Sequence, residues 1–209
     1  PGSIARLCAL APPDMGIIIA IGHAHYERFK TIDTVADAKF ELAEAVAAKN
    51  GKVVVPTDLL HFAKPQTLQK THPALFVTQE NERIKTVQTD KGITVTVPWQ
   101  GKDYTLDVPV YGLQQGTNIA LAFTAACTLG IDPDTVRTAL RSLPQIAHRL
   151  EVKPQPGAAT IIDDAYNSNP TGFSAALDVL NHLKRPDGRR ILVTPGMVEL
   201  GAAHDEKHA

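Results

Sequence analysis

The stretch MGIIIAIG at residues 15–22 is a continuous apolar run bounded by glycine. A run of this kind is typical of a strand buried on both faces, as in a parallel sheet. Residues 31–51 follow with Val35 and Leu42 at helical spacing and an Asn-Gly stop signal. KVVVP at 52–56 is a second apolar strand. Strand, helix and strand in this order form a βαβ unit, so we predict an α/β fold with a mostly parallel sheet.

The middle of the chain has a different pattern. From residue 74 to residue 110, β-rich runs are separated by the turn signals DKG (90–92) and QGKD (100–103). This alternation predicts an antiparallel β-rich portion. The apolar run at 118–130 and the segment at 131–143 then predict two helices.

A second α/β unit is predicted near the end of the chain. HRLEVKPQPG (148–157) resembles a linker. A strand in ATIIDDAY (159–166), a helix from Pro170 to Leu183 and a second strand in RRILVTPG (189–196) are predicted after it. These elements predict the start of a Rossmann-like domain. We therefore place a boundary near Ala147, which gives domains of residues 1–147 and 148–209.

Composition excludes several classes of protein. The 209 residues carry 21 Lys and Arg against 22 Asp and Glu, so no basic surplus points to nucleic acid. Cys8 and Cys127 are isolated, which disfavours a disulfide scaffold and fits a reducing cytoplasm. No apolar run approaches the roughly 20 residues of a membrane span. We expect a cytoplasmic monomer.

Polar residues follow the first predicted strand. His23 and His25 lie in IGHAHYERF (21–29) and would share a face of an extended segment, which suggests a cation site. The alternative is a solvated loop. Lys39 lies among small helical neighbours that could leave it half-buried, and the alternative there is a surface lysine whose stem covers apolar residues.

Three further segments carry polar groups. GLQQGTNIALA (112–122) places amide side chains at a helix start, where they could cap the helix or read a purine edge. IIDDAYNSNP (161–170) crowds acidic and amide groups at the end of a strand, as either a site or a polar turn. HDEKH (204–208) has aspartate where a zinc helix of the H-E-x-x-H type needs glutamate, which disfavours a metalloprotease.

The chain has no phosphate-binding P-loop. Gly-Lys occurs at 51–52 and 101–102, but Val53 and Asp103 follow where the motif needs serine or threonine.

Four stretches in this order resemble the Mur ligases: IGHAHYERF with ADAKFE (36–41), GLQQGTNIALA, HRLEV, and IIDDAYNSNP with GMVELG (196–201). The resemblance implies an ATP-dependent ligase of peptidoglycan precursor synthesis. In such a reaction ATP phosphorylates a carboxylate, and an amine attacks the acyl phosphate to form an amide. DDAYNSNP with GMVELG favours the family members that add D-Ala-D-Ala to a UDP-MurNAc-tripeptide.

The resemblance also implies catalytic and metal-binding residues. His25 matches a magnesium-binding histidine, and Lys39 matches a lysine that is carbamylated in many members. A carbamate would supply the oxygen ligands that Mg²⁺ prefers. Arg149 matches an arginine that reaches the ATP phosphates.

The implied nucleotide contacts lie in two segments. Asn118 matches an asparagine that contacts adenine, and Asp164 matches an aspartate that holds the ribose hydroxyls. The contact with the nucleotide would be completed by three residues that follow Asp164 in IIDDAYNSNP, namely Tyr166, Asn167 and Asn169.

The sequence departs from the family pattern at several positions. Gln114 and Gln115 stand where His-Asn is usual, His23 replaces a proline, and Pro195 replaces an aspartate. The P-loop strand and the domain that binds the UDP-sugar would lie upstream of Pro1. We therefore expect that this chain alone does not catalyse ligation.

Two alternatives stay open. Another ligase of the superfamily could share this core, such as a tripeptide-forming Mur enzyme, a lipid-linked precursor amidation subunit or a folylpolyglutamate synthase. A non-catalytic binding module could also have kept the fold and lost the P-loop.

Overall fold

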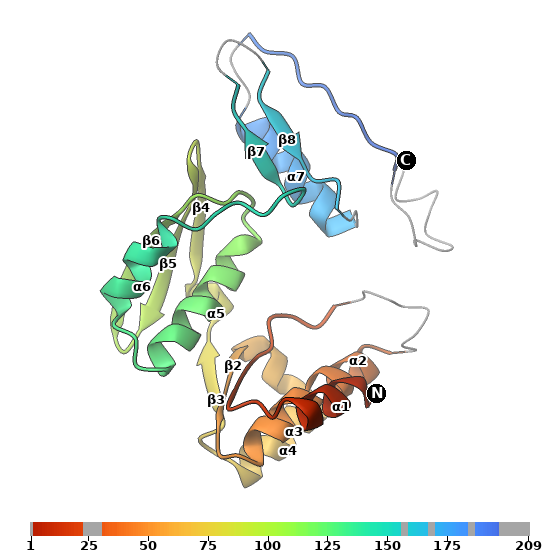
Figure 1. The fold of residues 1–209 in the computed structure, drawn as a ribbon, viewed down its shortest axis with the longest axis vertical. Coiled ribbons are helices and arrows are strands. Elements are labelled where there is room, and N and C mark those ends of the chain that lie inside the picture. Colours follow the sequence, from red (N-terminus) through yellow and green to blue (C-terminus); the bar gives the residue numbers. More distant parts are fainter. Residues whose placement is uncertain (1, 23–30, 156–158, 167–169, 184–186, 197–209) are drawn as a thin grey trace. The chain divides into compact units, whose positions relative to one another are not determined.

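The computed structural model describes residues 2–22, 31–155, 159–166, 170–183 and 187–196. The chain divides into two compact units, each described by itself (Figure 1). The first comprises Pro1–Ile84, Val97–Tyr104 and Thr117–Val136, and the second comprises Lys85–Thr96, Thr105–Gly116 and Arg137–Ala209.

Helices and strands alternate through the first half of the described chain, as the sequence predicts. The helices are α1 (Ser3–Leu10), α2 (Ile32–Lys39), α3 (Glu41–Ala47), α4 (Ala63–Thr71), α5 (Gln115–Thr128), α6 (Pro133–Leu140) and α7 (Pro170–His182), with short 3-10 turns at Thr57–His61 and Asn81–Arg83. The strands are β1 (Met15–Ile17), β2 (Lys52–Pro56), β3 (Phe76–Gln79), β4 (Lys85–Thr89), β5 (Gly92–Trp99), β6 (Lys102–Val108), β7 (Glu151–Lys153) and β8 (Ile161–Asp163).

A parallel sheet forms the centre of the first unit. Its strand order is β1-β2-β3, and both pairs of neighbours are parallel. Val54 of β2 lies between Ile17 of β1 and Val77 of β3. The predicted α/β fold with a mostly parallel sheet is confirmed.

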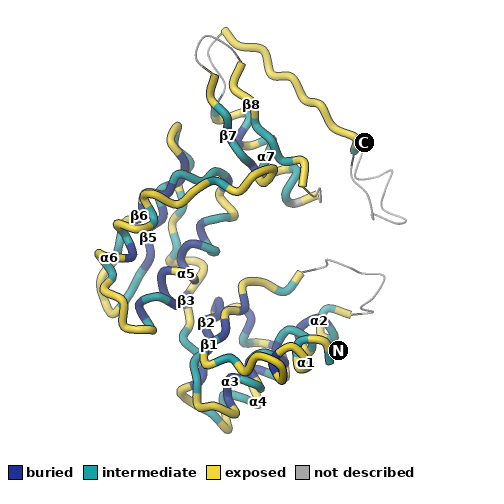
Figure 2. Tube along the Cα trace, viewed as in Figure 1, coloured by how far each residue is buried: buried dark blue, intermediate teal, exposed yellow. Residues whose placement is uncertain are grey.

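The middle strand of this sheet is buried on both faces (Figure 2). Val53 and Val55 contact a core that includes Phe40 and Val46 of the α2–α4 layer. Val54 points the other way and packs with Leu121 of α5. Because successive side chains of a strand face opposite sides, three consecutive valines can fill two cores. This explains the uninterrupted apolar pattern of KVVVP.

Two predicted elements of this unit are shorter than expected. The strand predicted for 15–22 ends at Ile17, although the Ile18 amide still donates to the Val54 carbonyl at 3.0 Å. The single helix predicted for 31–51 is two helices, α2 and α3, joined at the fully buried Phe40. Phe40 turns its ring into the core and Glu41 turns its carboxylate onto α1, which periodicity alone does not encode.

Glu41 caps a helix that is distant in sequence. Its Oε1 accepts a hydrogen bond from the Gly2 amide at 2.5 Å and its Oε2 from the Ala5 amide at 3.0 Å. These donors lie at the start of α1, where backbone N–H groups have no partner within the helix. A carboxylate there also interacts favourably with the helix dipole.

Replacing Glu41 by alanine is expected to lower the free energy of unfolding by about 1–3 kcal/mol, since a hydrogen bond to a charged group contributes in this range. Urea denaturation would measure the change. Glu44→Ala is the matched control, because the Glu44 side chain forms a surface ion pair with Lys64 at 3.2 Å. Its loss should change stability by less than about 1 kcal/mol. Equal effects of the two substitutions would contradict the capping role.

The β-rich middle of the chain forms a second sheet of order β4-β5-β6. β4 and β5 are antiparallel, and a turn at Asp90-Lys91 joins them. Gln100 and Gly101 join β5 to β6 with φ of 47° and 81°, the backbone of a tight hairpin turn. The predicted antiparallel portion is confirmed here, but β3 pairs in parallel with β2 and does not belong to it.

The end of the chain contains a small layer of strand and helix. β7 and β8 are antiparallel and pack on α7 through Leu150, Val152 and Val179. The predicted linker 148–157 is thus wrong in part, because it contains β7. The predicted strand at 189–196 is also wrong: in the described chain this segment belongs to no sheet. An apolar sequence forms a strand only where a neighbouring strand accepts its backbone hydrogen bonds.

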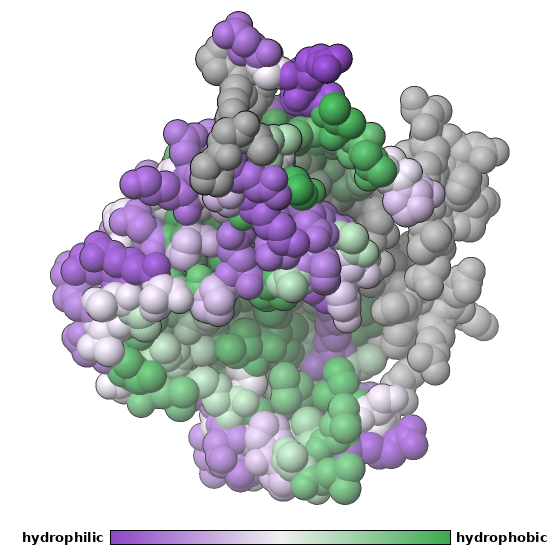
Figure 3. Space-filling view, turned by 45° about the horizontal axis from the view of Figure 1, so that its top comes forward, coloured by the Kyte–Doolittle hydropathy of each residue, from purple (hydrophilic) through white to green (hydrophobic). Residues whose placement is uncertain are grey.

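Apolar side chains reach the surface in this unit. Ile191 and Val193 are 76% and 91% exposed. Figure 3 shows hydrophobic side chains among hydrophilic ones on one face of the molecule.

None of the helices in the described part of the chain is long and apolar enough to cross a membrane.

Candidate functional site

Lys39 is the last residue of α2 and is half-buried. Its Nζ donates to the Ala20 carbonyl at 2.6 Å, so the amine lies near the segment that follows β1. Burial lowers the pKa of Lys39, because removal from water disfavours the charged form. A lysine with a lowered pKa is deprotonated, and therefore nucleophilic, more often than a solvated surface lysine is.

The cation site predicted at His23 and His25 lies outside the described residues. Lys39 as an unmodified ammonium does not fit a magnesium ion, because like charges repel. A carbamate on the same nitrogen would fit one, since it offers anionic oxygen ligands.

The segment that leads into α5 contacts β4. The Gly112 amide donates to Oε1 of Gln88 at 2.9 Å, and Gly112 has φ of 92°, a conformation that favours glycine. A Cβ at Gly116 would collide with the Thr86 side chain. Asn118 is half-buried in the first turn of α5, as expected for a helix start that carries amide side chains.

The turn before β7 presents Arg149. His148 and Leu150, on either side of it, have φ of 61° and 51°. Positive φ is uncommon for residues with a side chain and persists only where the surroundings stabilise it. Arg149 itself is exposed.

Arg149 of this turn lies together with two other predicted site residues, Asp164 and Tyr166. The Arg149 guanidinium lies 4.1 Å from the centre of the Tyr166 ring, a cation–π contact. Oδ1 of Asp164 accepts a hydrogen bond from the Leu150 amide at 2.9 Å. Arg149 is exposed, Tyr166 is 66% exposed, and Asp164 beside them is half-buried. Asn167 and Asn169 lie outside the described residues.

Burial raises the pKa of the Asp164 carboxyl, whereas the Leu150 amide and the positive charge of Arg149 oppose the rise. Asp163 also raises it as a neighbouring negative charge. Arg149 and Leu150 therefore favour the ionised form, in which the carboxylate accepts hydrogen bonds.

Asp163 lies in a separate charged cluster. Its Oδ2 accepts hydrogen bonds from Lys153 Nζ and from His148 Nδ1, each at 2.9 Å, and Lys153 also contacts Glu151 at 3.0 Å. These bonds hold the pKa of Asp163 at about 2, below its ordinary 3.8. His148, Glu151 and Asp163 place ligand atoms within 4.8 Å of one another, but Lys153 already supplies the positive charge.

The lowered pKa of Asp163 makes stability depend on acid pH. Its contribution to the folded state is fully present above about pH 4 and is lost as the pH falls from 3.8 toward 2, because the unfolded chain binds the proton first. Urea denaturation of the wild type and of Asp163→Asn should give stabilities that differ at neutral pH and converge below pH 3. A constant difference down to about pH 2 would contradict the assignment.

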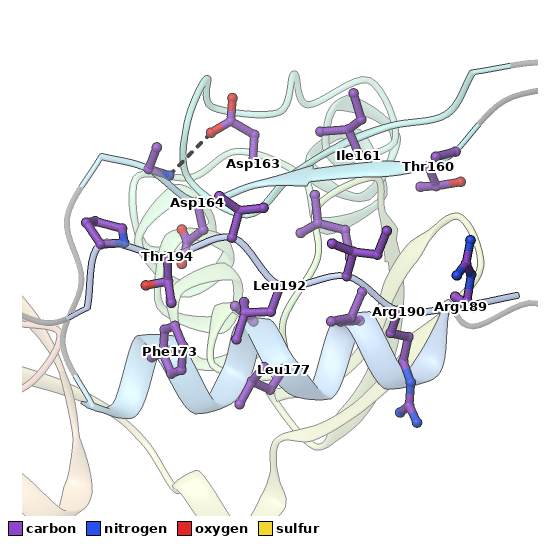
Figure 4. Close-up of a pocket in the computed structure, with 18 of the residues that line it drawn as sticks. Thr160, Ile161, Asp163, Asp164, Phe173, Leu177, Arg189, Arg190, Leu192 and Thr194 are labelled. Atoms are coloured by element: carbon purple, nitrogen blue, oxygen red, sulfur yellow. Dashed lines mark hydrogen bonds between the residues drawn. The ribbon is translucent and has the colours of Figure 1, made fainter. Parts of the chain in front are cut away.

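A cavity of about 560 Å³ lies between β8, α7 and the segment 189–196. Figure 4 shows the Asp164 carboxylate directed toward Thr194 and Phe173 at one end of it, whereas Asp163 points to the other side of the strand. The rest of the lining is mostly apolar. The two adjacent aspartates therefore face different surroundings, as strand alternation requires.

The sequence did not predict two of these groups. The cluster of His148, Lys153 and Asp163 was missed, although Glu151 and Lys153 lie two apart in a strand and so share a face. The bond from Gly112 to Gln88 joins residues 24 positions apart, and no local pattern indicates it.

Comparison with known proteins defines the class of this chain. Residues 1–126 match the Mur ligase middle domain, and residues 148–209 match the Mur ligase glutamate ligase domain. The chain therefore belongs to the Mur ligase family.

Two relatives of this chain carry the same enzyme name. The chain is 27% identical over 208 residues to the UDP-N-acetylmuramoyl-tripeptide–D-alanyl-D-alanine ligase of Bacillus subtilis, covering 99% of the chain and 44% of the relative. It is 31% identical over 217 residues to the enzyme of that name from Mycobacterium tuberculosis, covering 98% and 42%. The chain thus spans less than half the length of these relatives.

Solved structures of MurF proteins have the same fold as this chain. MurF from Thermotoga maritima in complex with ADP matches with a TM-score of 0.73 and 27% identity, covering 100% of the chain and 48% of MurF. MurF from Acinetobacter baumannii matches with a TM-score of 0.82 and 21% identity, covering 100% and 45%.

Proposed function

We propose that the protein carrying this chain is an ATP-dependent amide ligase of peptidoglycan precursor synthesis. It would add D-Ala-D-Ala to UDP-MurNAc-tripeptide through an acyl phosphate, as a cytoplasmic monomer. The observation that carries the proposal is the group of Arg149, Asp164 and Tyr166, in a chain whose similar proteins bear the name of this reaction.

The grouped residues suit a nucleotide. Arg149 offers a guanidinium to phosphate oxygens, with paired N–H donors that match their geometry. Asp164 uses Oδ1 for the Leu150 amide, so Oδ2 would accept a ribose hydroxyl. The exposed Tyr166 ring, with Asn167 and Asn169 after it, would complete this loop, and Asn118 would contact adenine.

Mg²⁺ would neutralise phosphate oxygens during phosphoryl transfer. Lys39, as a carbamate, and His25 are the residues we assign to it. The half-burial of Lys39 and its lowered pKa support this assignment, because carbamylation needs a neutral amine. We also propose residues 1–147 and 148–209 as the domain division, and that this chain alone does not catalyse ligation.

Substrate comparison with the whole gene product tests the proposal. ADP release should depend on UDP-MurNAc-tripeptide and D-Ala-D-Ala together, and single amino acids or folate with glutamate should not replace the dipeptide. The coding sequence upstream of Pro1 should encode G-x-x-G-K followed by serine or threonine. A start codon at this point, or no ADP release with any amine, would favour a binding module instead.

A further inference from the structure

The turn that carries Arg149 does not form from local preference alone. His148 and Leu150 both have left-handed φ, at 61° and 51°, and neither is glycine. Side-chain contact with the backbone disfavours this conformation. The turn therefore needs partners elsewhere in the fold that hold its backbone.

Those partners are two carboxylates and one backbone amide. Glu151 Oε2 accepts a hydrogen bond from the His148 amide at 3.2 Å, and Asp164 Oδ1 accepts one from the Leu150 amide at 2.9 Å. The His148 carbonyl accepts one from the Tyr166 amide at 3.0 Å. The two segments that contribute Arg149 and Asp164 are thus bonded to each other on both sides of Arg149.

Asp163 connects the same two segments from the opposite face of β8. Its Oδ2 lies 2.9 Å from both His148 Nδ1 and Lys153 Nζ, and its Oδ1 accepts a hydrogen bond from the Ala165 amide at 3.3 Å. Figure 4 shows that Asp163 points away from the side on which Asp164 lies. Asp163 is therefore suited to hold the backbone rather than to contact the ligand of Asp164.

We propose that Asp163 and Lys153 are positioning residues for the nucleotide site: their ion pair, with the His148 ring, fixes the 148–150 turn so that Arg149 and Asp164 face one nucleotide. This inference rests on the proposed function, which makes Arg149 and Asp164 nucleotide ligands. Asp163 and Lys153 act through these two residues and make no contact with nucleotide themselves.

Titration of the whole gene product with MgADP tests the role. Asp163→Asn and Lys153→Met should each weaken binding by about tenfold, the effect of losing a charged hydrogen bond. Lys153→Arg keeps the charge and should bind within about twofold of wild type. Asp107→Asn is the matched control, since it removes an exposed carboxylate that accepts from Thr94 at 2.9 Å, and it should bind as wild type does.

A double-mutant cycle separates positioning from general destabilisation. If Asp163 acts through Arg149 and Asp164, adding Asp163→Asn to Arg149→Ala should weaken MgADP binding by less than about threefold further, because only the effect through Asp164 remains. Multiplication of the two effects would overturn the inference, as would wild-type binding by Asp163→Asn. If the wild type does not bind MgADP, or if Arg149→Ala and Asp164→Ala bind it normally, the proposed function fails first and the positioning role with it.

Discussion

Replacing Lys39 by alanine is expected to lower kcat of the whole ligase by at least about 100-fold, because the substitution removes the proposed carbamate ligand of Mg²⁺ and the charge stabilisation that the ion supplies. Binding of ADP without metal should change little. The measurement is ADP release at saturating ATP, UDP-MurNAc-tripeptide and D-Ala-D-Ala. Lys64→Ala is the control, since it removes a lysine whose partner is the surface residue Glu44.

Lys39→Arg distinguishes a carbamate from a cation. Arginine keeps the positive charge but forms no carbamate under these conditions, so the variant should be as inactive as Lys39→Ala. ¹³C NMR with labelled bicarbonate should show a carbamate signal in the wild type that both variants lack. An active Lys39→Arg enzyme, or a wild type without this signal, would show that Lys39 has another role.

Replacing Arg149 by alanine is expected to lower kcat/KM for ATP by about 100-fold, since a guanidinium on the ATP phosphates stabilises their charge both in the bound nucleotide and in the transition state. Arg149→Lys should recover part of the loss, because it keeps the charge and loses the paired donors. Tyr166→Phe keeps the ring that lies under the guanidinium and should change kcat/KM by less than about threefold.

The matched control for Arg149 is Arg141, an exposed arginine of the same unit. Arg141→Ala should leave kcat/KM for ATP within about twofold of wild type. If Arg149→Ala and Arg141→Ala gave the same small loss, Arg149 would be a surface residue and the proposed site would lose its cation. The KM for UDP-MurNAc-tripeptide should stay constant in both variants.

The sequence could predict those elements of the fold that local pattern determines. The continuous valines of KVVVP indicated a strand buried on both faces, and the structure places them between two layers of helix. The turn signals at 90–92 and 100–103 predicted hairpins, because glycine and polar residues there favour tight turns. The resemblance to Mur ligases, carried by four ordered motifs, is confirmed by the domain matches.

Other features depended on residues far apart in the chain. The break between α2 and α3 follows from Phe40 entering the core and Glu41 capping α1, which lies more than 30 residues earlier. The segment 189–196 has a strand sequence, but none of the described strands pairs with it. Periodicity in the sequence cannot predict either feature, since each depends on which residues lie nearby in the folded chain.

The sequence by itself determined the α/β class, the family and the identity of the candidate residues, because these depend on residue types and on their order. The tertiary structure decided that Arg149, Asp164 and Tyr166 lie together, and that Asp163 belongs to a different cluster from its neighbour. The reason is geometric. Strand alternation turns Asp163 and Asp164 to opposite faces, and only the left-handed turn at His148 and Leu150 brings Arg149 over the ring of Tyr166.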